Sequence, residues 1–168
     1  MNELDFERLF ALAKPYLEKN ELGSEHTSRV LRIARQNFTI PSNLRDLTVA
    51  AIILHDIGGS TIKEQYEKGP AIAAALLRQV GCDEATILQI CQIVGSHHDH
   101  PDNPTLPFRV LFDSDKLVMF SPEEYPGYAA RFDVDWNKTI SLLYSKKAKK
   151  IAQEMLWKRR GEQIKSEN

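Results

Sequence analysis

Hydrophobic residues recur along most of the chain at spacings of three and four, which predicts amphipathic helices. A further helix is predicted over Leu47–Leu54, which is apolar nearly all round and is therefore expected to be buried. No segment shows the alternation that a half-buried strand requires. The pattern predicts an all-α fold of about seven helices. Besides Leu47–Leu54, their expected ranges are 5–19, 25–37, 71–80, 83–98, 108–120 and 137–160.

Three polar segments lack helical periodicity and are predicted to be irregular. They cover residues 58–69, 99–107 and 121–136; the first is expected to hold no more than a short turn of helix, and the third is predicted as a loop or a broken helix. Ser24 is predicted to cap the helix that follows it. Pro70 is predicted to occupy the first turn of its helix, where a missing N–H costs nothing.

The overall composition describes an ordinary globular protein. Of 168 residues, 42% are hydrophobic and 27% are charged, which predicts a single domain over residues 1–168 with a motif-bearing core at about 24–119 and a covering helix at 137–160. The formal net charge of −1 argues against nucleic acid as an obligate partner. Neither a membrane span nor a signal peptide is predicted, so we expect a cytoplasmic protein. Association into homo-oligomers is left open.

The last predicted helix carries a cluster of basic residues. Such a cluster could contact phosphates, but the balanced total charge favours the solvated face of a terminal helix. The cluster consists of Lys146, Lys147, Lys149, Lys150, Lys158, Arg159 and Arg160.

His55 and Asp56 follow the apolar run and precede two glycines. A buried carboxylate is costly unless it is paired or binds a metal, and the glycines are expected to end the helix just beyond it. Taken alone, the pair is better explained as a hydrogen-bonded helix end than as a metal site, because a dipeptide is a weak signal.

Other predicted helices also carry polar residues where apolar ones are expected. His26 lies on an inward stripe, His97 and His98 end another helix, and Asp115 lies within an apolar face. Helical bundles build metal sites from inward side chains of this kind. Imidazole and carboxylate ligands together suit Mn, Fe, Co, Ni, Zn and, less well, Mg.

Two acidic residues near the end of this series must be told apart. Asp115 has apolar residues three and four positions away on both sides, whereas Asp113 has Arg109 and Lys116 at such spacings. Asp115 is therefore predicted as a ligand. Asp113 is predicted to face solvent or to support the site from outside.

The order His26, His55-Asp56, Asp115 resembles the HD superfamily of metal-dependent phosphohydrolases, and its HDIG-type domains in particular. The resemblance rests on Ala-Ala-Ile-Ile-Leu-His-Asp-Ile-Gly-Gly and Phe-Asp-Ser-Asp-Lys-Leu, and it extends from about Ser24 to Met119. It implies an HD-domain helical bundle whose four residues bind a divalent metal. It also implies that a metal-activated water hydrolyses a nucleotide or another small phosphate ester.

His97 and His98 resemble the histidine pair that two-metal members use around a second ion. Such members usually carry a further histidine just ahead of the helix that starts at Pro70, where this chain has Glu67-Lys68-Gly69. One tightly held ion is therefore favoured, with the pair as ligands of a second ion or as phosphate donors.

The remaining roles follow from the same reading. Asp56, His97 and His98 are the predicted catalytic residues: Asp56 as ligand and proton acceptor, the histidines as donors to the leaving oxygen. Arg29 and Lys116 are candidates for phosphate contact. Two alternatives remain open: an HD-type di-iron oxygenase, and a degenerate module that binds metal or nucleotide without turnover.

Overall fold

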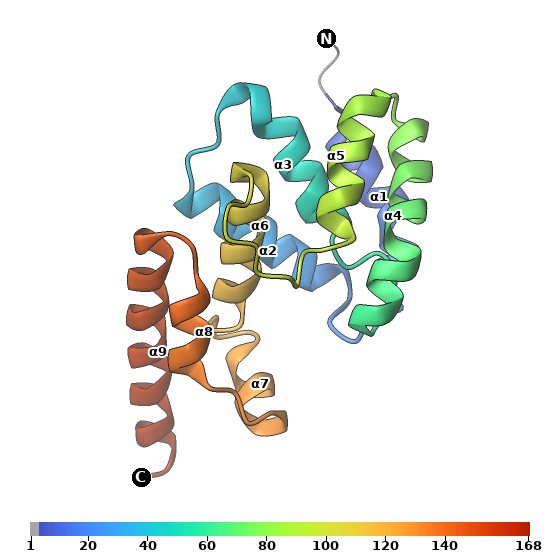
Figure 1. Cartoon of the computed structure of the whole chain (residues 1–168). Coiled ribbons are helices and arrows are strands. Elements are labelled where there is room, and N and C mark those ends of the chain that lie inside the picture. Colours follow the sequence, from blue (N-terminus) through green and yellow to red (C-terminus); the bar gives the residue numbers. More distant parts are fainter. Residues whose placement is uncertain (1–3) are drawn as a thin grey trace. The chain divides into compact units, whose positions relative to one another are not determined.

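In the computed structural model, which describes residues 4–168, every regular element is an α-helix (Figure 1). The all-α prediction is confirmed. Within that range there are nine helices, because the segment 121–136 contains a short helix over residues 125–131 and the last predicted helix is divided in two. None of the helices described is long and apolar enough to cross a bilayer. The helices are α1 Phe6–Leu17, α2 Gly23–Asn37, α3 Ser42–Leu54, α4 Ile62–Gln79, α5 Glu84–Val94, α6 Leu106–Val118, α7 Tyr125–Arg131, α8 Trp136–Leu142 and α9 Lys146–Ser166.

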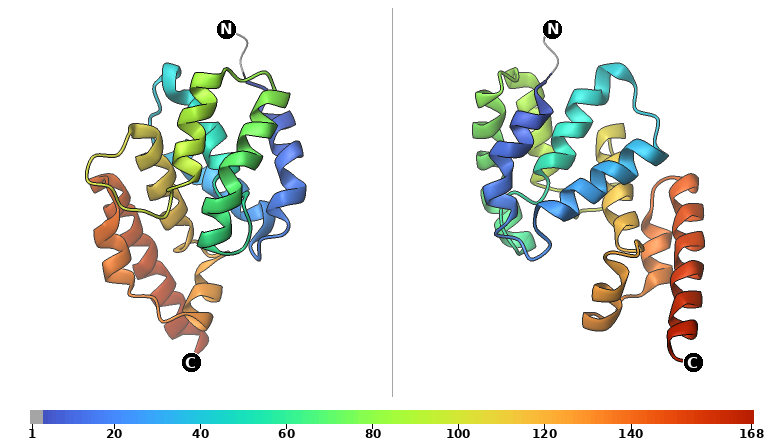
Figure 2. Two further views of the ribbon diagram at one scale, coloured as in Figure 1. Left: turned by 45° about the vertical axis from the view of Figure 1, so that its right-hand side comes forward. Right: turned by 180° about the vertical axis from the view of Figure 1, so that it is seen from behind.

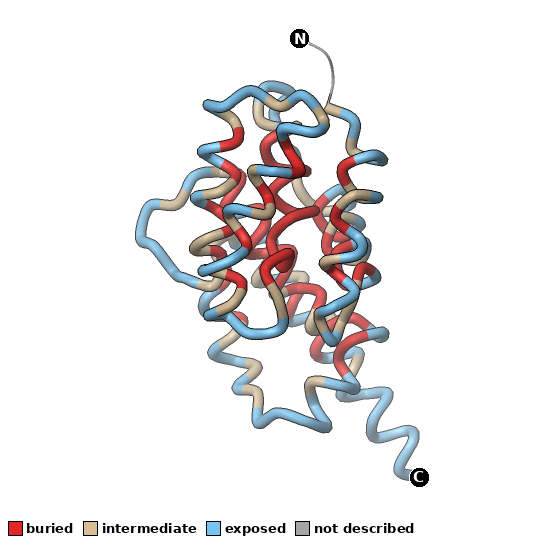
Figure 3. Tube along the Cα trace, turned by 90° about the vertical axis from the view of Figure 1, so that its right-hand side faces the viewer, coloured by how far each residue is buried: buried red, intermediate tan, exposed pale blue. Residues whose placement is uncertain are grey.

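The chain forms two compact units, which meet in sequence between Leu111 and Phe112, within α6. In the first unit α3 packs against α1, α2 and α5, and α4 and α5 lie side by side (Figure 2). Every residue of Leu47–Leu54 is buried, as predicted, and Figure 3 shows buried residues on the inner sides of these helices. Full burial of a large aliphatic side chain contributes about 1.5–3 kcal/mol, so α3 anchors this unit.

The prediction of an irregular segment over 58–69 is wrong for most of its length, because α4 begins at Ile62 and runs through Pro70. Pro70 therefore lies inside the helix, and its predicted place in the first turn is also wrong. Thr61 and Glu64 form a reciprocal capping box, and Glu64 also pairs with Lys68 one turn on. Caps and such pairs stabilise a helix without any apolar stripe. This part of α4 is thus a polar helix that hydrophobic periodicity does not reveal.

Two glycines connect α3 to α4 for different reasons. A Cβ on Gly58 would lie 2.5 Å from the Cα of Gln65, so only glycine lets α4 approach this closely. Gly59 has φ 141°, a conformation that side-chain-bearing residues rarely adopt. The helix ends at Leu54, before His55-Asp56 and not just beyond the pair as expected, and the turn that follows brings α4 against the end of α3.

The start of α2 differs from the prediction that Ser24 caps it. Gly23, at φ 62°, is already the first helical residue, and the capping position is Leu22, whose side chain cannot cap. The Ser24 hydroxyl instead donates a hydrogen bond to the Glu18 carboxylate. The helix thus begins two residues before the predicted start at residue 25, and His26 lies in its first turn on the buried face.

In the second unit, the predicted single helix over 137–160 is wrong, since α8 ends at Leu142 and α9 begins at Lys146. The two helices pack together, and Trp136 at the start of α8 contacts Phe120 and Tyr125 with ring centroids 5.0 and 4.8 Å away. After the break, α9 runs antiparallel to α8 (Figure 1), as expected of packed helices joined by a short turn.

Asp113 explains the break between α8 and α9. It is 1% exposed, and its two carboxylate oxygens accept hydrogen bonds from the N–H groups of Tyr144 (2.7 Å) and Ser145 (3.0 Å). Ser145 in turn caps α9 by accepting from the Ala148 N–H. The prediction that Asp113 faces solvent is wrong, because its partners lie more than thirty residues further along the chain.

Asp113→Ala is therefore expected to lower the free energy of unfolding by about 2–4 kcal/mol, because it leaves two backbone donors without their charged acceptor. Urea denaturation measures this loss. Asp133→Ala, at an exposed position of the same unit, serves as the control and should change stability by less than about 0.5 kcal/mol. Equal effects of the two substitutions would contradict a structural role for Asp113.

Candidate metal centre

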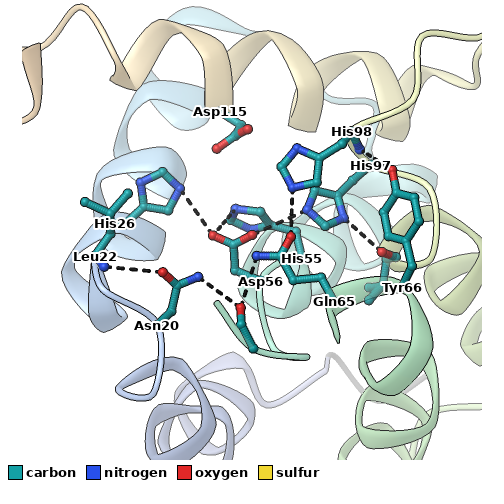
Figure 4. Close-up of polar contacts among 12 residues, drawn as sticks. Asn20, Leu22, His26, His55, Asp56, Gln65, Tyr66, His97, His98 and Asp115 are labelled. Atoms are coloured by element: carbon teal, nitrogen blue, oxygen red, sulfur yellow. Dashed lines mark hydrogen bonds and ion pairs between the residues drawn. The ribbon is translucent and has the colours of Figure 1, made fainter. Parts of the chain in front are cut away.

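Five predicted site residues of the first unit come together where three helices start or end (Figure 4). His26 comes from the first turn of α2, His55 and Asp56 follow α3, and His97 and His98 follow α5. The Asp56 carboxylate lies among them. Its Oδ2 is 3.7 Å from His26 Nε2 and 3.4 Å from His55 Nε2, and its Oδ1 is 3.4 Å from His97 Nε2.

The cluster is largely closed to solvent. His26, His55, Asp56 and His97 are all buried, and His55 has no exposed surface. Bulk water therefore offsets little of the cost of burying the carboxylate, and a cation bound at the cluster would offset it.

Main-chain carbonyls fix the tautomers of two of the imidazoles. His55 Nδ1 lies 2.7 Å from the Ile52 carbonyl oxygen, and His97 Nδ1 lies 2.8 Å from that of Val94. A carbonyl oxygen can only accept, so each Nδ1 carries the hydrogen and each neutral ring keeps its lone pair on Nε2. Metal-binding histidines are commonly oriented in this way by a backbone carbonyl.

The two Nε2 lone pairs therefore face carboxylate oxygens, which are acceptors as well. Such an arrangement is unfavourable unless a positive charge lies between the atoms. Consistent with this, His97 Nε2 is buried and has no hydrogen-bond partner among residues 4–168. These donor types and this unmet acceptor fit a divalent metal ion.

The ligand atoms form two groups that share Asp56. One consists of His26, His55 and Asp56, and the other of Asp56, His97 and His98; within each group the ligand atoms lie within 4.8 Å of one another. The first group corresponds to three of the four predicted ligands. The second corresponds to the predicted place for a second ion or a phosphate.

Gln65, which the sequence did not single out, contacts the second group from α4. Its Nε2 donates to the Gly59 carbonyl oxygen at 3.2 Å, which turns its Oε1 toward His98 Nε2 at 2.8 Å. Because an amide oxygen only accepts, His98 donates from Nε2. The orientation of the Gln65 amide thus fixes the tautomer of His98.

Tyr66, the next residue, holds His98 through the backbone. Its hydroxyl accepts from the His98 N–H at 2.9 Å and donates to the Asp99 carboxylate at 3.0 Å. Burial, with a further contribution from Asp99, raises the pKa of Tyr66 to about 12, so the phenol stays protonated and can donate. Both residues were missed because their segment was expected to be irregular, although Thr61-x-x-Glu64 is a capping-box signal.

Gln65→Leu is expected to release the His98 ring, because leucine has a similar size but no acceptor. The imidazole ¹⁵N signals of His98 should move from the Nε2–H pattern toward a mixture of tautomers, and metal affinity should fall by about 10- to 100-fold, as is typical when a ligand-orienting partner is lost. Gln89→Leu, at an exposed position on α5, is the matched control. Unchanged His98 signals would contradict the assignment.

The remaining predicted residues lie as follows. Arg29, one turn after His26 on α2, has its Nη1 3.6 Å from the Glu25 carboxylate. Asp115 and Lys116 lie on the part of α6 that belongs to the second unit, where Lys116 Nζ is 3.2 Å from Asp115 Oδ2. Asp115 is buried, as its apolar spacing predicted. Its place in the ligand set, and phosphate contact by Arg29 and Lys116, stay predictions of the sequence.

Comparison with known proteins gives two findings. Residues 23–119 match the family model described as HD domain. The fold is similar to the crystal structure of a protein described as a predicted HD superfamily hydrolase, from an uncultured Thermotogales bacterium, with a TM-score of 0.67 and 17% identity over 95% of this chain and 89% of that chain. No curated protein matches. The matched range includes every residue of the cluster.

Proposed function

The chain belongs to the HD domain family, and on this premise we propose that it is a metal-dependent phosphohydrolase acting on a nucleotide or another small phosphate ester. The observation that carries the proposal is the buried Asp56 carboxylate, which faces the Nε2 atoms of His55 and His97 while main-chain carbonyls hold both Nδ1–H groups. A residue that only caps a helix does not need two imidazole Nε2 atoms facing its carboxylate.

We assign His26, His55 and Asp56 to the divalent ion, which would be Mn, Fe, Co, Ni, Zn or Mg. The sequence resemblance alone supports Asp115 as the fourth ligand. When bound, such an ion supplies a Lewis acid that lowers the pKa of water and offsets negative charge on a phosphoryl group. The buried surroundings of these residues keep bulk water from weakening those interactions.

The two oxygens of Asp56 have different surroundings, which suggests different tasks. Oδ2 faces His26 and His55, so we assign it to the ion. Oδ1 faces His97, on the side of the second group. We assign Oδ1 as the atom that accepts the proton from the attacking water, in the manner of a general base.

His97 and His98 serve the phosphoryl group in this proposal. The Nε2 lone pair of His97 makes it a ligand when the second group holds an ion, and a donor to a phosphate or leaving oxygen when Nε2 is protonated. His98 is held in place by Gln65 and Tyr66. A rigid second group favours one orientation of the substrate. Such positioning lowers the activation barrier of the reaction.

The test combines metal analysis with an activity panel. The purified protein is stripped with a chelator, reconstituted with Mn²⁺, Co²⁺, Ni²⁺, Zn²⁺, Fe²⁺ or Mg²⁺, and assayed on nucleotide monoesters, cyclic nucleotides and pyrophosphate-containing nucleotides. We expect at least one ion per chain and hydrolysis of at least one ester class. His100→Gln, which removes an exposed histidine outside the cluster, is the control and should behave like the wild type.

The outcomes separate the proposal from its alternatives. A protein that binds none of these ions would overturn the metal assignment. Metal binding with no turnover on any ester class would indicate a binding module. Iron binding accompanied by oxygen consumption, with no hydrolysis, would indicate an oxygenase.

A further inference from the structure

The second unit contains a pocket whose lining includes none of the HD motif residues. It has a volume of about 320 Å³ and lies between one end of α9 and the start of α7. Two prolines and Tyr125 form one wall, and α9 contributes Arg159, Glu162, Gln163 and Ser166. This volume falls within the range of small-molecule sites.

Arg159 is the unusual member of this pocket. Its side chain is only 10% exposed, and its Nε and Nη1 are buried with no hydrogen-bond partner in the part of the chain that the structure describes. The expectation that Arg159 belongs to a solvated basic face is therefore wrong. Its neighbour Arg160 is exposed, as that expectation requires.

A buried guanidinium with unmet donors is energetically costly, because it has lost its hydration without gaining acceptors. Its Nη2 lies 3.1 Å from Glu162 Oε1, but the Glu162 side chain is 63% exposed and meets only one of the guanidinium nitrogens. The Tyr125 hydroxyl donates to Gln163 Oε1 at 3.3 Å, which places further polar groups on the same pocket.

We propose that this pocket binds a small oxyanion, a carboxylate or a phosphate, with Arg159 as its anchor. Guanidinium groups carry only donors, arranged in a plane, and their natural partners are carboxylate and phosphate oxygens. The apolar wall of prolines and tyrosine suits a ligand whose anionic group is attached to a compact apolar body.

Glu162 acts as an internal competitor in this site. It is bound to Arg159 by a single ion pair in which the Glu162 side chain is 63% exposed, so this carboxylate can turn toward solvent at small cost. An arriving anion takes the place of Glu162 on Nη2 of Arg159. Removing the Glu162 charge should therefore strengthen anion binding.

The test uses the metal-free full chain, so that it does not depend on the proposed hydrolase activity. Inorganic phosphate and acetate are titrated separately, at constant ionic strength, while side-chain NMR signals of Gln163 and Tyr125 and the midpoint of thermal unfolding are followed. We expect saturable shifts of these signals in the wild type with at least one of the two anions. Whichever anion binds more tightly identifies the preferred class.

Matched variants make the result specific. Arg160→Gln removes the same charge one residue away and should bind like the wild type, whereas Arg159→Gln should lose saturable binding. Glu162→Gln keeps Arg159 and should raise affinity about two- to fivefold, the worth of an exposed ion pair. If Arg159→Gln fails to fold, the Glu162→Gln variant still tests the proposal, because it keeps Arg159.

Two results would overturn the proposal. One is a wild type in which neither anion shifts the Gln163 and Tyr125 signals. The other is an equal loss of anion affinity in Arg159→Gln and Arg160→Gln, which would show that the anion responds only to the overall positive charge of α9.

Discussion

Asp56→Asn is expected to abolish metal binding by the cluster and to lower hydrolysis by about three orders of magnitude or more, because one atom change removes both a ligand charge and a proton acceptor. Asparagine has the same shape, so the packing around it is kept. Its amide NH₂ group, however, is a hydrogen-bond donor and cannot coordinate a cation. Metal content and turnover of the reconstituted variant measure the effect.

The same substitution has an opposite effect on the metal-free protein. There the wild-type carboxylate lies buried against two Nε2 lone pairs, a contact that the neutral amide relieves. Metal-free Asp56→Asn should therefore be at least as stable as the metal-free wild type in urea denaturation. Only the wild type should gain stability when metal is added, since ligands stabilise the state that binds them.

This pair of measurements separates a metal ligand from a helix cap. If Asp56 merely satisfied the end of α3, the asparagine variant would lose stability without metal and both proteins would respond to metal alike. Asp102→Asn, an exposed carboxylate in the loop after His98, is the control and should leave metal binding, turnover and stability unchanged.

Most of the first unit could be predicted because hydrophobic burial dominates it. The apolar run over Leu47–Leu54 predicts a central helix, and polar residues that interrupt such apolar faces are conspicuous. His26, His55, Asp56, His97 and His98 were found in this way, and the structure brings all five together. A misplaced polar residue is a reliable signal because its burial needs compensation.

The residues that were missed depend on contacts that a helical pattern does not contain. Gln65 and Tyr66 lie on a polar stretch of α4, which a capping box and side-chain pairs stabilise. Asp113 binds backbone N–H groups from beyond α8, so its neighbours at helical spacing were misleading. The burial of Arg159 depends on the elements packed against α9, which periodicity within α9 does not show.

Gly58→Ala is expected to cost about 3 kcal/mol of stability or more, at the upper end of what overpacking costs. The added Cβ would lie 2.5 Å from the Cα of Gln65 and 2.7 and 2.8 Å from the carbonyl oxygens of Glu64 and Gln65. All three are backbone atoms, so relief requires a shift of α4 itself. Urea denaturation of the metal-free protein measures the loss.

Gly161→Ala is the matched control with the opposite sign. Gly161 lies inside α9, and a Cβ there would meet nothing within 4 Å. Alanine should therefore stabilise the protein by about 0.5–1 kcal/mol through helix propensity alone. A Gly58→Ala protein as stable as the wild type would show that α4 does not need its close approach to α3.

The Gly58 substitution also tests how the helix end is coupled to the histidines. A shift of α4 moves Gln65, which fixes the tautomer of His98. In folded Gly58→Ala protein, the His98 ¹⁵N signals should therefore change as they do in Gln65→Leu, while the Nδ1–H signal of His55, held by the Ile52 carbonyl, stays in place. If the His55 signal moved and that of His98 did not, strain from Gly58 would be relieved within the turn after α3 and would not reach α4.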